Sequence, residues 1–210
     1  MATLTLYGTP ISVYVRAVRL LLEEAGASYD LKEVGIFDGQ NTAAEYLAKN
    51  PFGKVPTLDI DGTALYETVA INEYLDEAVA NGKFSPSDPL QKAKMRQIMA
   101  IVDSYLYGPT IRSIVIQRVI VPSQGGKMDE EVVKGGIDPA KKAMEAIESI
   151  AICSPYLMGS ELTLADFRLI PVFVYFANTP EFHTVTAQTP KLKDWWQKVS
   201  QLPVVQKVCG

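Results

Sequence analysis

The chain is poor in the side chains that most often carry hydrolytic and metal chemistry. Among 210 residues there is one histidine, His183, and there are two cysteines, Cys153 and Cys209, far apart in the sequence. A Ser–His–Asp triad therefore depends on His183 alone, which lies in a loop-like stretch of the second half. The two cysteines have neither metal-ligand spacing nor a CxxC pattern. We expect no metal site, no disulfide scaffold and no protease or esterase activity.

The sequence also lacks a basic surplus and a long apolar run. Lys and Arg number 20 against 24 Asp and Glu, which gives a formal net charge of −4 at pH 7. Nucleic acid and anionic membranes are therefore not the expected partners. No stretch approaches the roughly 18 consecutive apolar residues of a membrane-spanning helix. The start MATLTLYG carries no secretory signal pattern, so we expect a cytoplasmic protein.

An alternation of strand and helix patterns is present in the first 80 residues. Apolar residues are 48% of the chain, enough to bury a sizeable core. A strand–helix–strand order at the start indicates a parallel pair, and Asp61–Gly62 marks a hairpin. The expected strands are 3–7, 27–34, 57–60 and 64–66, and the expected helices begin at 13, 42 and 68.

Residues 81–88 form a composition break, NGKFSPSD, after which only helical patterns follow. Asp88 followed by Pro89 opens one helix, expected to run past Tyr105 and to kink at Gly108–Pro109. Further helices are expected near 138–151, after LTLADF (162–167) and at 189–199, and LTLADF has the spacing of a capping box with a hydrophobic staple. The predicted organisation is an α/β domain over 1–80, a linker over 81–88 and an all-helical domain over 89–210.

Three segments of the first domain leave polar backbone or side-chain groups open. Ser12 begins a helix, which by itself predicts only an N-cap. Pro56 cannot donate to a sheet ladder, and a cis Val55–Pro56 bond points the Val55 amide and carbonyl outward, although X–Pro bonds are usually trans. Glu67 and Thr68 begin another helix, whose first amides attract anions. Together the segments indicate a site for a peptide-like anionic ligand.

The ordered set Y-G-x-x-x-S, N-P-x-G-K-V-P and E-[ST]-x-A-I-x-x-Y-L resembles the cytosolic glutathione S-transferases, most closely serine-type classes that are phi-like or of a related bacterial or plant type. The resemblance covers the whole chain. It implies a thioredoxin-like N-terminal domain of order βαβαββα, followed by an all-α C-terminal domain. It also implies attack of a glutathione thiolate on hydrophobic electrophiles, an additional peroxidase activity, glutathione as co-substrate and no other cofactor.

The resemblance assigns the catalytic hydroxyl to Ser12, which would donate a hydrogen bond to the glutathione sulfur. Tyr7 is the rival, because tyrosine-type relatives use a tyrosine at the end of the first strand. The remaining glutathione-binding residues implied by the resemblance are Asn41, Lys54, Val55, Pro56, Glu67 and Thr68. Asn41 and Thr42 stand where phi-like members often have His and Lys, which leaves less positive charge for the glycyl carboxylate.

The second substrate is expected to meet apolar side chains near the start of the helical domain, with Ile11, Phe37, Ile111 and Val115 as candidates. Phe52, in the NPFG loop, is the candidate aromatic contact of a homodimer. The alternative function is a non-catalytic binding or interaction module that keeps the fold without the chemistry. A complete thiol-activating set favours the enzyme.

Overall fold

The computed structural model describes residues 2–210, which divide into two compact units. The first unit contains the chain up to Phe84 together with Pro203–Gly210, and the second contains Ser85–Leu202. Along the first unit the elements are β1 (Leu4–Tyr7), α1 (Val13–Glu24), β2 (Asp30–Lys32), the short 3₁₀ helix η1 (Gln40–Thr42), α2 (Ala44–Leu47), β3 (Thr57–Ile60), β4 (Thr63–Tyr66), α3 (Thr68–Ala78) and α10 (Pro203–Cys209).

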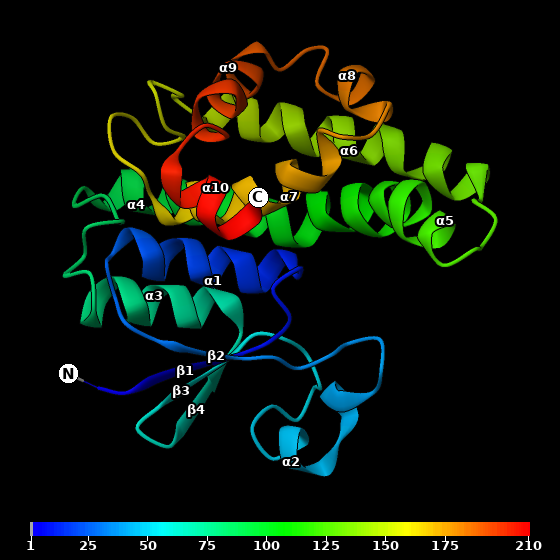
Figure 1. The fold of residues 1–210 in the computed structure, drawn as a ribbon. Coiled ribbons are helices and arrows are strands. Elements are labelled where there is room, and N and C mark those ends of the chain that lie inside the picture. Colours follow the sequence, from blue (N-terminus) through cyan, green and yellow to red (C-terminus); the bar gives the residue numbers. More distant parts are fainter. Residues whose placement is uncertain (1) are drawn as a thin grey trace. The chain divides into compact units, whose positions relative to one another are not determined.

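The first unit is built on a four-stranded sheet of order β2-β1-β3-β4. β1 and β2 are parallel, whereas β3 is antiparallel to both β1 and β4. Figure 1 shows α1 and α3 side by side on one face of this sheet. The thioredoxin-like order βαβαββα, the parallel pair and the hairpin are thereby confirmed. β2 is shorter than the predicted strand over 27–34, because only Asp30–Lys32 lie opposite β1.

Strand alternation explains the core of the first unit. Leu4 and Leu6 are buried and alternate with the half-buried Thr5 and Tyr7, so the two pairs face opposite sides of the sheet. Leu6 lies opposite Leu58 of β3, and both are fully buried. The apolar stripe of α1 and the buried residues of α3 complete this core; they are Val15, Val18, Leu22, Ile71 and Leu75.

The C-terminal helix α10 packs on α1 within the first unit, and Lys207 Nζ lies 2.6 Å from Glu23 Oε2. This ion pair is the largest cause of a lowered pKa at the Glu23 carboxyl. No pattern in the sequence indicates that residues 203–209 return to the first 84.

The second unit is helical throughout its regular elements. These are α4 (Pro89–Ile101), η2 (Val102–Leu106), η3 (Gly108–Ile120), α5 (Val121–Ser123), α6 (Glu130–Ile150), α7 (Leu164–Phe176), α8 (Glu181–Val185) and α9 (Pro190–Val199). The start of α6, which Gly135–Gly136 obscures in the sequence, is set by Asp129, whose carboxylate accepts from the amides of Glu131 and Val132.

The helical backbone continues past the predicted kink at Gly108–Pro109. η2 and η3 have π-helical hydrogen bonding, in which Tyr107 N–H donates to the Val102 carbonyl and Val121 N–H to that of Ile116, five residues back. The buried Thr110 hydroxyl donates to the Leu106 carbonyl at 2.7 Å. Pro109 lacks an N–H and therefore donates no hydrogen bond to the preceding turn.

Gly136 lets α6 approach η3 closely. A Cβ atom at this position would lie 2.8 Å from the Pro109 carbonyl oxygen and 3.0 Å from the Ser113 Cβ. Gly135, in the adjacent position of the same helix, is exposed and has no atom within 4 Å of its virtual Cβ. A side chain would therefore meet neighbouring atoms at Gly136, whereas the space at Gly135 is open.

We expect Gly136→Ala to lower the free energy of unfolding by about 1–3 kcal/mol, because the methyl group meets backbone that cannot move aside easily. Gly135→Ala is the matched control and should raise it by up to about 1 kcal/mol, since alanine loses less entropy in a helix. Equilibrium urea unfolding followed by circular dichroism measures both. Equal stabilisation by the two variants would contradict the close approach at Gly136.

Asp166 holds the start of α7 to two other parts of the second unit. Its carboxylate accepts from the Leu157 amide, the Thr163 amide and hydroxyl, and the Trp195 indole N–H, at 2.8–2.9 Å. Burial raises the pKa of this carboxyl, while the same hydrogen bonds act to lower it. The capping box predicted from LTLADF is confirmed, and the Trp195 contact adds α9 to it.

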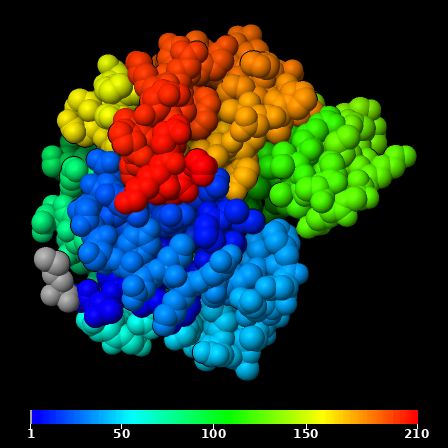
Figure 2. Space-filling view, in the orientation of Figure 1, coloured from blue at the N-terminus to red at the C-terminus, as the bar shows by residue number. Residues whose placement is uncertain are grey.

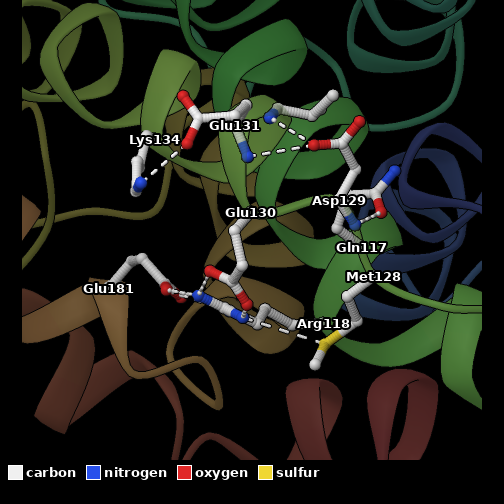
Figure 3. A network of polar contacts seen from close by, with 9 residues as sticks. Gln117, Arg118, Met128, Asp129, Glu130, Glu131, Lys134 and Glu181 are labelled. Carbon is white, nitrogen blue, oxygen red and sulfur yellow. Dashed lines mark hydrogen bonds and ion pairs between the residues drawn. The ribbon is translucent and has the colours of Figure 1, made fainter.

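Arg118 joins three further elements of the second unit (Figure 3). Its guanidinium, at the end of η3, binds both oxygens of Glu130 in α6 and also Glu181 Oε1 in α8. Beside it, the Asp129 amide donates to the Gln117 side chain at 2.8 Å. The network fixes the turn between η3 and α6 against α8.

Candidate functional site

Ser12 lies at the N-terminus of α1 as its N-cap. Its Oγ accepts from the Val15 amide at 3.4 Å, a long distance for such a bond. Accepting uses a lone pair, so the hydroxyl hydrogen remains available as a donor, and no described residue accepts from it. The cap and a donor role are compatible in this geometry.

The Val55–Pro56 peptide bond is cis, the less common of the two forms weighed in the sequence analysis. No described residue hydrogen-bonds the backbone N–H or C=O of Val55, whereas Pro56 and Thr57 are buried at the start of β3. The preceding carbonyl of Lys54 accepts from the Tyr46 hydroxyl at 2.6 Å and from the Asn50 amide at 2.8 Å. The open peptide groups are therefore presented by a braced loop.

Glu67 and Thr68 connect β4 to α3. Glu67 has φ +69°, in the left-handed region that residues other than glycine adopt at a cost. Thr68 is 7% exposed, and its hydroxyl has no partner among the described residues. The Glu67 carbonyl accepts from Ile71 N–H, which leaves the amides of the first α3 turn without helical partners.

The sheet register brings these three segments to one end of the sheet. Tyr7 lies opposite Thr57, and Thr57 lies opposite Tyr66, so the three residues form one row across β1, β3 and β4. The chain continues from Tyr7 to Ser12, enters Thr57 from Val55–Pro56, and leaves Tyr66 for Glu67–Thr68. Helix N-termini, an unpaired peptide group and a buried hydroxyl are thus gathered where a short extended peptide could pair.

The side chain of Asn41 is fixed by a hydrogen bond, whereas that of Lys54 is exposed. The Asn41 side-chain N–H donates to the Gly53 carbonyl at 2.8 Å, which ties the segment before α2 to the loop before β3. The Lys54 side chain is exposed and makes no ion pair with a described residue. Lys54 can therefore meet a carboxylate directly, whereas Asn41 positions the loop with one of its amide hydrogens.

Tyr7 faces the α2 side of the sheet. Its ring centroid lies 5.7 Å from Lys32 Nζ and 5.1 Å from Lys49 Nζ, and Lys49 follows α2. This face is opposite to that of the buried Leu6, on the side away from α1 and α3. The geometry thus favours Ser12 over Tyr7 as the donor at the α1 terminus.

The four apolar candidates are divided between the two units. Ile11 and Phe37, in the first unit, are 50% and 68% exposed. Ile111 and Val115, in the second, are buried on η3 at 7% and 3% exposure. Their shared role in an electrophile pocket stays a prediction.

Sequence reasoning missed the residues that brace the site. Tyr46 in α2 donates to the Lys54 carbonyl, and its oxygen also lies 2.9 Å from the Thr57 hydroxyl; burial raises its pKa. A single tyrosine in a four-residue helix gives no periodic signal, so only the folded chain identifies this function. The Asn50 contact belongs to the N-P-x-G-K-V-P motif and could have been sought there.

Two family descriptions match the chain: "Glutathione S-transferase, N-terminal domain" over residues 6–83 and "Glutathione S-transferase, C-terminal domain" over residues 130–197. Among curated relatives, Glutathione S-transferase 1 of Zea mays is 31% identical and Probable glutathione S-transferase GSTF2 of Oryza sativa subsp. japonica is 32% identical. Both alignments cover 100% of this chain and 97% of the relative.

Solved structures agree with the sequence relatives. A glutathione S-transferase-I bound with lactoylglutathione has a TM-score of 0.84 at 30% identity, covering 99% of each chain. A glutathione S-transferase I from maize, in complex with an atrazine glutathione conjugate, has a TM-score of 0.84 at 29% identity, covering 99% of this chain and 97% of the other. The fold is a thioredoxin-like domain followed by a helical domain. The chain belongs to the glutathione S-transferase family, which confirms the resemblance.

Two further findings concern metal binding and membrane spanning by the described residues. Over residues 2–210, no set of three or more His, Cys, Asp or Glu side chains is placed to hold a metal ion. Within the same range, every helix is too short or too polar to cross a bilayer.

Proposed function

We propose that this chain is a glutathione transferase in which the Ser12 hydroxyl stabilises the glutathione thiolate for attack on hydrophobic electrophiles. The observation that carries the proposal is the register row Tyr7–Thr57–Tyr66, because it gathers the Ser12, Val55–Pro56 and Glu67–Thr68 segments at one end of the sheet. Family membership supports the reaction class, since the relatives are transferases of glutathione.

The mechanism follows from electrostatics at the start of α1. A free thiol has a pKa of about 8.5, and hydrogen bonds and helix N-termini stabilise the thiolate. The Ser12 hydroxyl donates to the sulfur as the thiol proton passes to solvent. The sulfur lone pair then forms a carbon–sulfur bond with the electrophile; with chlorodinitrobenzene, the carbon–chlorine bond breaks and chloride leaves. Ser12 acts as a donor and forms no covalent bond.

The remaining residues bind the tripeptide. The Val55 N–H and C=O pair antiparallel with the cysteinyl part, in the manner of an added strand, with Pro56 fixing their direction. The Thr68 hydroxyl and the first amides of α3 hold the γ-glutamyl carboxylate, while Glu67 accepts from the ammonium group. Lys54 meets the glycyl carboxylate, and Asn41 positions the adjoining loop.

We expect Thr68→Ala to weaken glutathione binding about 10- to 100-fold, because a hydrogen bond to a charged group contributes roughly 1.5–3 kcal/mol. Thr68→Ser keeps the hydroxyl and should restore most of the affinity, which separates the hydrogen bond from packing. Isothermal titration with glutathione measures both dissociation constants. A wild-type constant for Thr68→Ala would remove this residue from the carboxylate site.

The alternative to this proposal is a binding module that has the same fold but no catalytic activity. Retention on immobilised glutathione without turnover on chlorodinitrobenzene and other electrophiles would support the module instead. The additional peroxidase activity stays a prediction, and organic hydroperoxides added to the same assay test it.

The proposal extends to a cytoplasmic homodimer. Phe52 is 65% exposed, unusual for a phenylalanine, and its ring meets the Tyr66 ring edge-on with centroids 5.9 Å apart. Such an aromatic group on a braced loop suits insertion into a second copy. Sedimentation equilibrium at assay concentrations tests the dimer.

A further inference from the structure

The first unit contains a cavity that lies apart from the proposed glutathione-binding residues. Its volume is about 350 Å³, and its lining includes Tyr7, Lys32, Glu33, Glu45, Tyr46 and Lys49. Ser12, Asn41, Lys54, Val55, Pro56, Glu67 and Thr68 do not line it. In Figure 2 the light-blue atoms of the residues that follow β2 lie at the surface. The cavity thus shares none of the proposed binding residues, although Tyr46, which donates to the Lys54 carbonyl, also lines it.

Two ammonium groups converge on one aromatic ring in this cavity. Lys32 lies directly beside Tyr7 in the parallel β1–β2 pair, and its Nζ is 5.7 Å from the Tyr7 ring centroid. Lys49 Nζ is 5.1 Å from the same centroid. A ring attracts a cation, but two cations at one ring also repel each other, and an anion between them removes that repulsion.

The positive charges of Lys32 and Lys49 are only partly neutralised by ion pairs within the protein. Lys49 has one carboxylate neighbour, Asp59, at 3.9 Å, while Lys32 makes no ion pair with any residue between 2 and 210. The Tyr7 hydroxyl also has no hydrogen-bond partner in that range. Lys32, Lys49 and the Tyr7 hydroxyl all belong to residues that line the cavity, and they are its available donors.

We propose that this cavity binds a small organic anion, whose carboxylate or phosphate group is held by Lys32, Lys49 and the Tyr7 hydroxyl. The volume suits a ligand at the lower end of the usual range, roughly 300–1,000 Å³. Glu33 and Glu45 also line the cavity and repel a second negative group. The ligand therefore carries one anionic group, and its remaining part is neutral and packs against the Tyr46 ring.

Benzoate and phenyl phosphate are suitable probes, with benzylamine as a cation of similar size. ¹H–¹⁵N correlation spectra of the whole chain follow the amides of Lys32, Val34 and Tyr46 during each titration. A saturating concentration of S-hexylglutathione is present throughout, so that the proposed glutathione site is occupied. The variants are the double substitution Lys32→Gln, Lys49→Gln and the control Lys142→Gln, an exposed lysine of α6.

We expect saturable shifts with benzoate or phenyl phosphate and none with benzylamine. The double variant should weaken binding about tenfold or more, since each tenfold step is about 1.4 kcal/mol, while Lys142→Gln should leave it unchanged. Added salt should also weaken binding. Tighter binding of phenyl phosphate identifies phosphate esters as the ligand class, and tighter binding of benzoate identifies carboxylic acids.

Absence of saturable shifts, equal binding by the double variant or preference for benzylamine would overturn the proposal. So would shifts that appear only in a parallel titration without S-hexylglutathione, because the probes would then occupy the glutathione site. The site does not depend on the proposed transferase activity: anion binding in a chain without turnover supports the cavity and contradicts the proposed function, and the reverse result does the opposite.

Discussion

Ser12→Ala is expected to lower kcat for the conjugation of chlorodinitrobenzene by about 10²–10³-fold, the usual cost of removing one donor that stabilises a developing anion. The KM for glutathione should change little, because Val55, Thr68 and the amides of α3 still bind the tripeptide. An interaction that acts on the charged form of the thiol lowers kcat and kcat/KM together when it is lost.

The pH dependence gives a second measurement of the same effect. With Ser12 present, the apparent pKa of the bound thiol should lie below the free value of about 8.5, and in Ser12→Ala it should rise towards that value. Turnover of the variant should therefore recover in part as the pH is raised. Ultraviolet absorbance of the thiolate and the pH–rate profile report this pKa independently.

The control for Ser12→Ala is Ser28→Ala, which removes an exposed hydroxyl from the same unit. It should leave kcat and the pH profile at their wild-type values. Full turnover in Ser12→Ala, together with a large loss in Tyr7→Phe, would assign the catalytic hydroxyl to Tyr7 instead.

Asp166→Ala is expected to lower the free energy of unfolding by about 4 kcal/mol or more, since each buried donor left without its acceptor costs roughly 1–3 kcal/mol. The variant leaves the Leu157 and Thr163 amides, the Thr163 hydroxyl and the Trp195 indole N–H without this acceptor. Urea unfolding, followed by circular dichroism and tryptophan fluorescence, measures the loss.

Two companion variants keep this prediction testable if Asp166→Ala does not accumulate. Trp195→Phe removes one of the four donors, so we expect a smaller loss of about 1–2 kcal/mol plus the cost of repacking the ring. Asp194→Ala changes an exposed aspartate in α9 and should stay within about 0.5 kcal/mol of wild type. Similar stabilities for Asp166→Ala and Asp194→Ala would show that the capping cluster contributes little.

Most of the first unit was predictable because its signals are local. Ser12 begins α1 through its own side chain, and Asp61–Gly62 forms a turn through its backbone preferences. The candidate site was inferred from three segments in order along the chain, namely Ser12, Val55–Pro56 and Glu67–Thr68. The register of β1, β3 and β4 then joins them at one end of the sheet.

What the sequence did not reveal depends on contacts between distant residues. Trp195 reaches Asp166 across 29 positions, and Lys207 reaches Glu23 across 184. The close approach at Gly136 has the same origin, since a glycine in a helical pattern looks like an interruption until its neighbour is known. The continuation of the helix through Pro109 is a local effect instead, because the backbone there adopts i→i−5 bonding, a rare pattern that residue spacing does not predict.

The open peptide groups of Val55 and the unpartnered amides of α3 belong to the main chain, which every residue type carries. A site built in this way recognises the spacing of a ligand's peptide groups more than the chemistry of its own side chains. The side chains around these main-chain groups can therefore change over evolution with little effect on the binding of glutathione. Ser12 and Thr68 are the exceptions in the proposed site, because their hydroxyls have no backbone substitute. Selection should consequently act on Ser12 through reaction rate and on Thr68 through the affinity for glutathione.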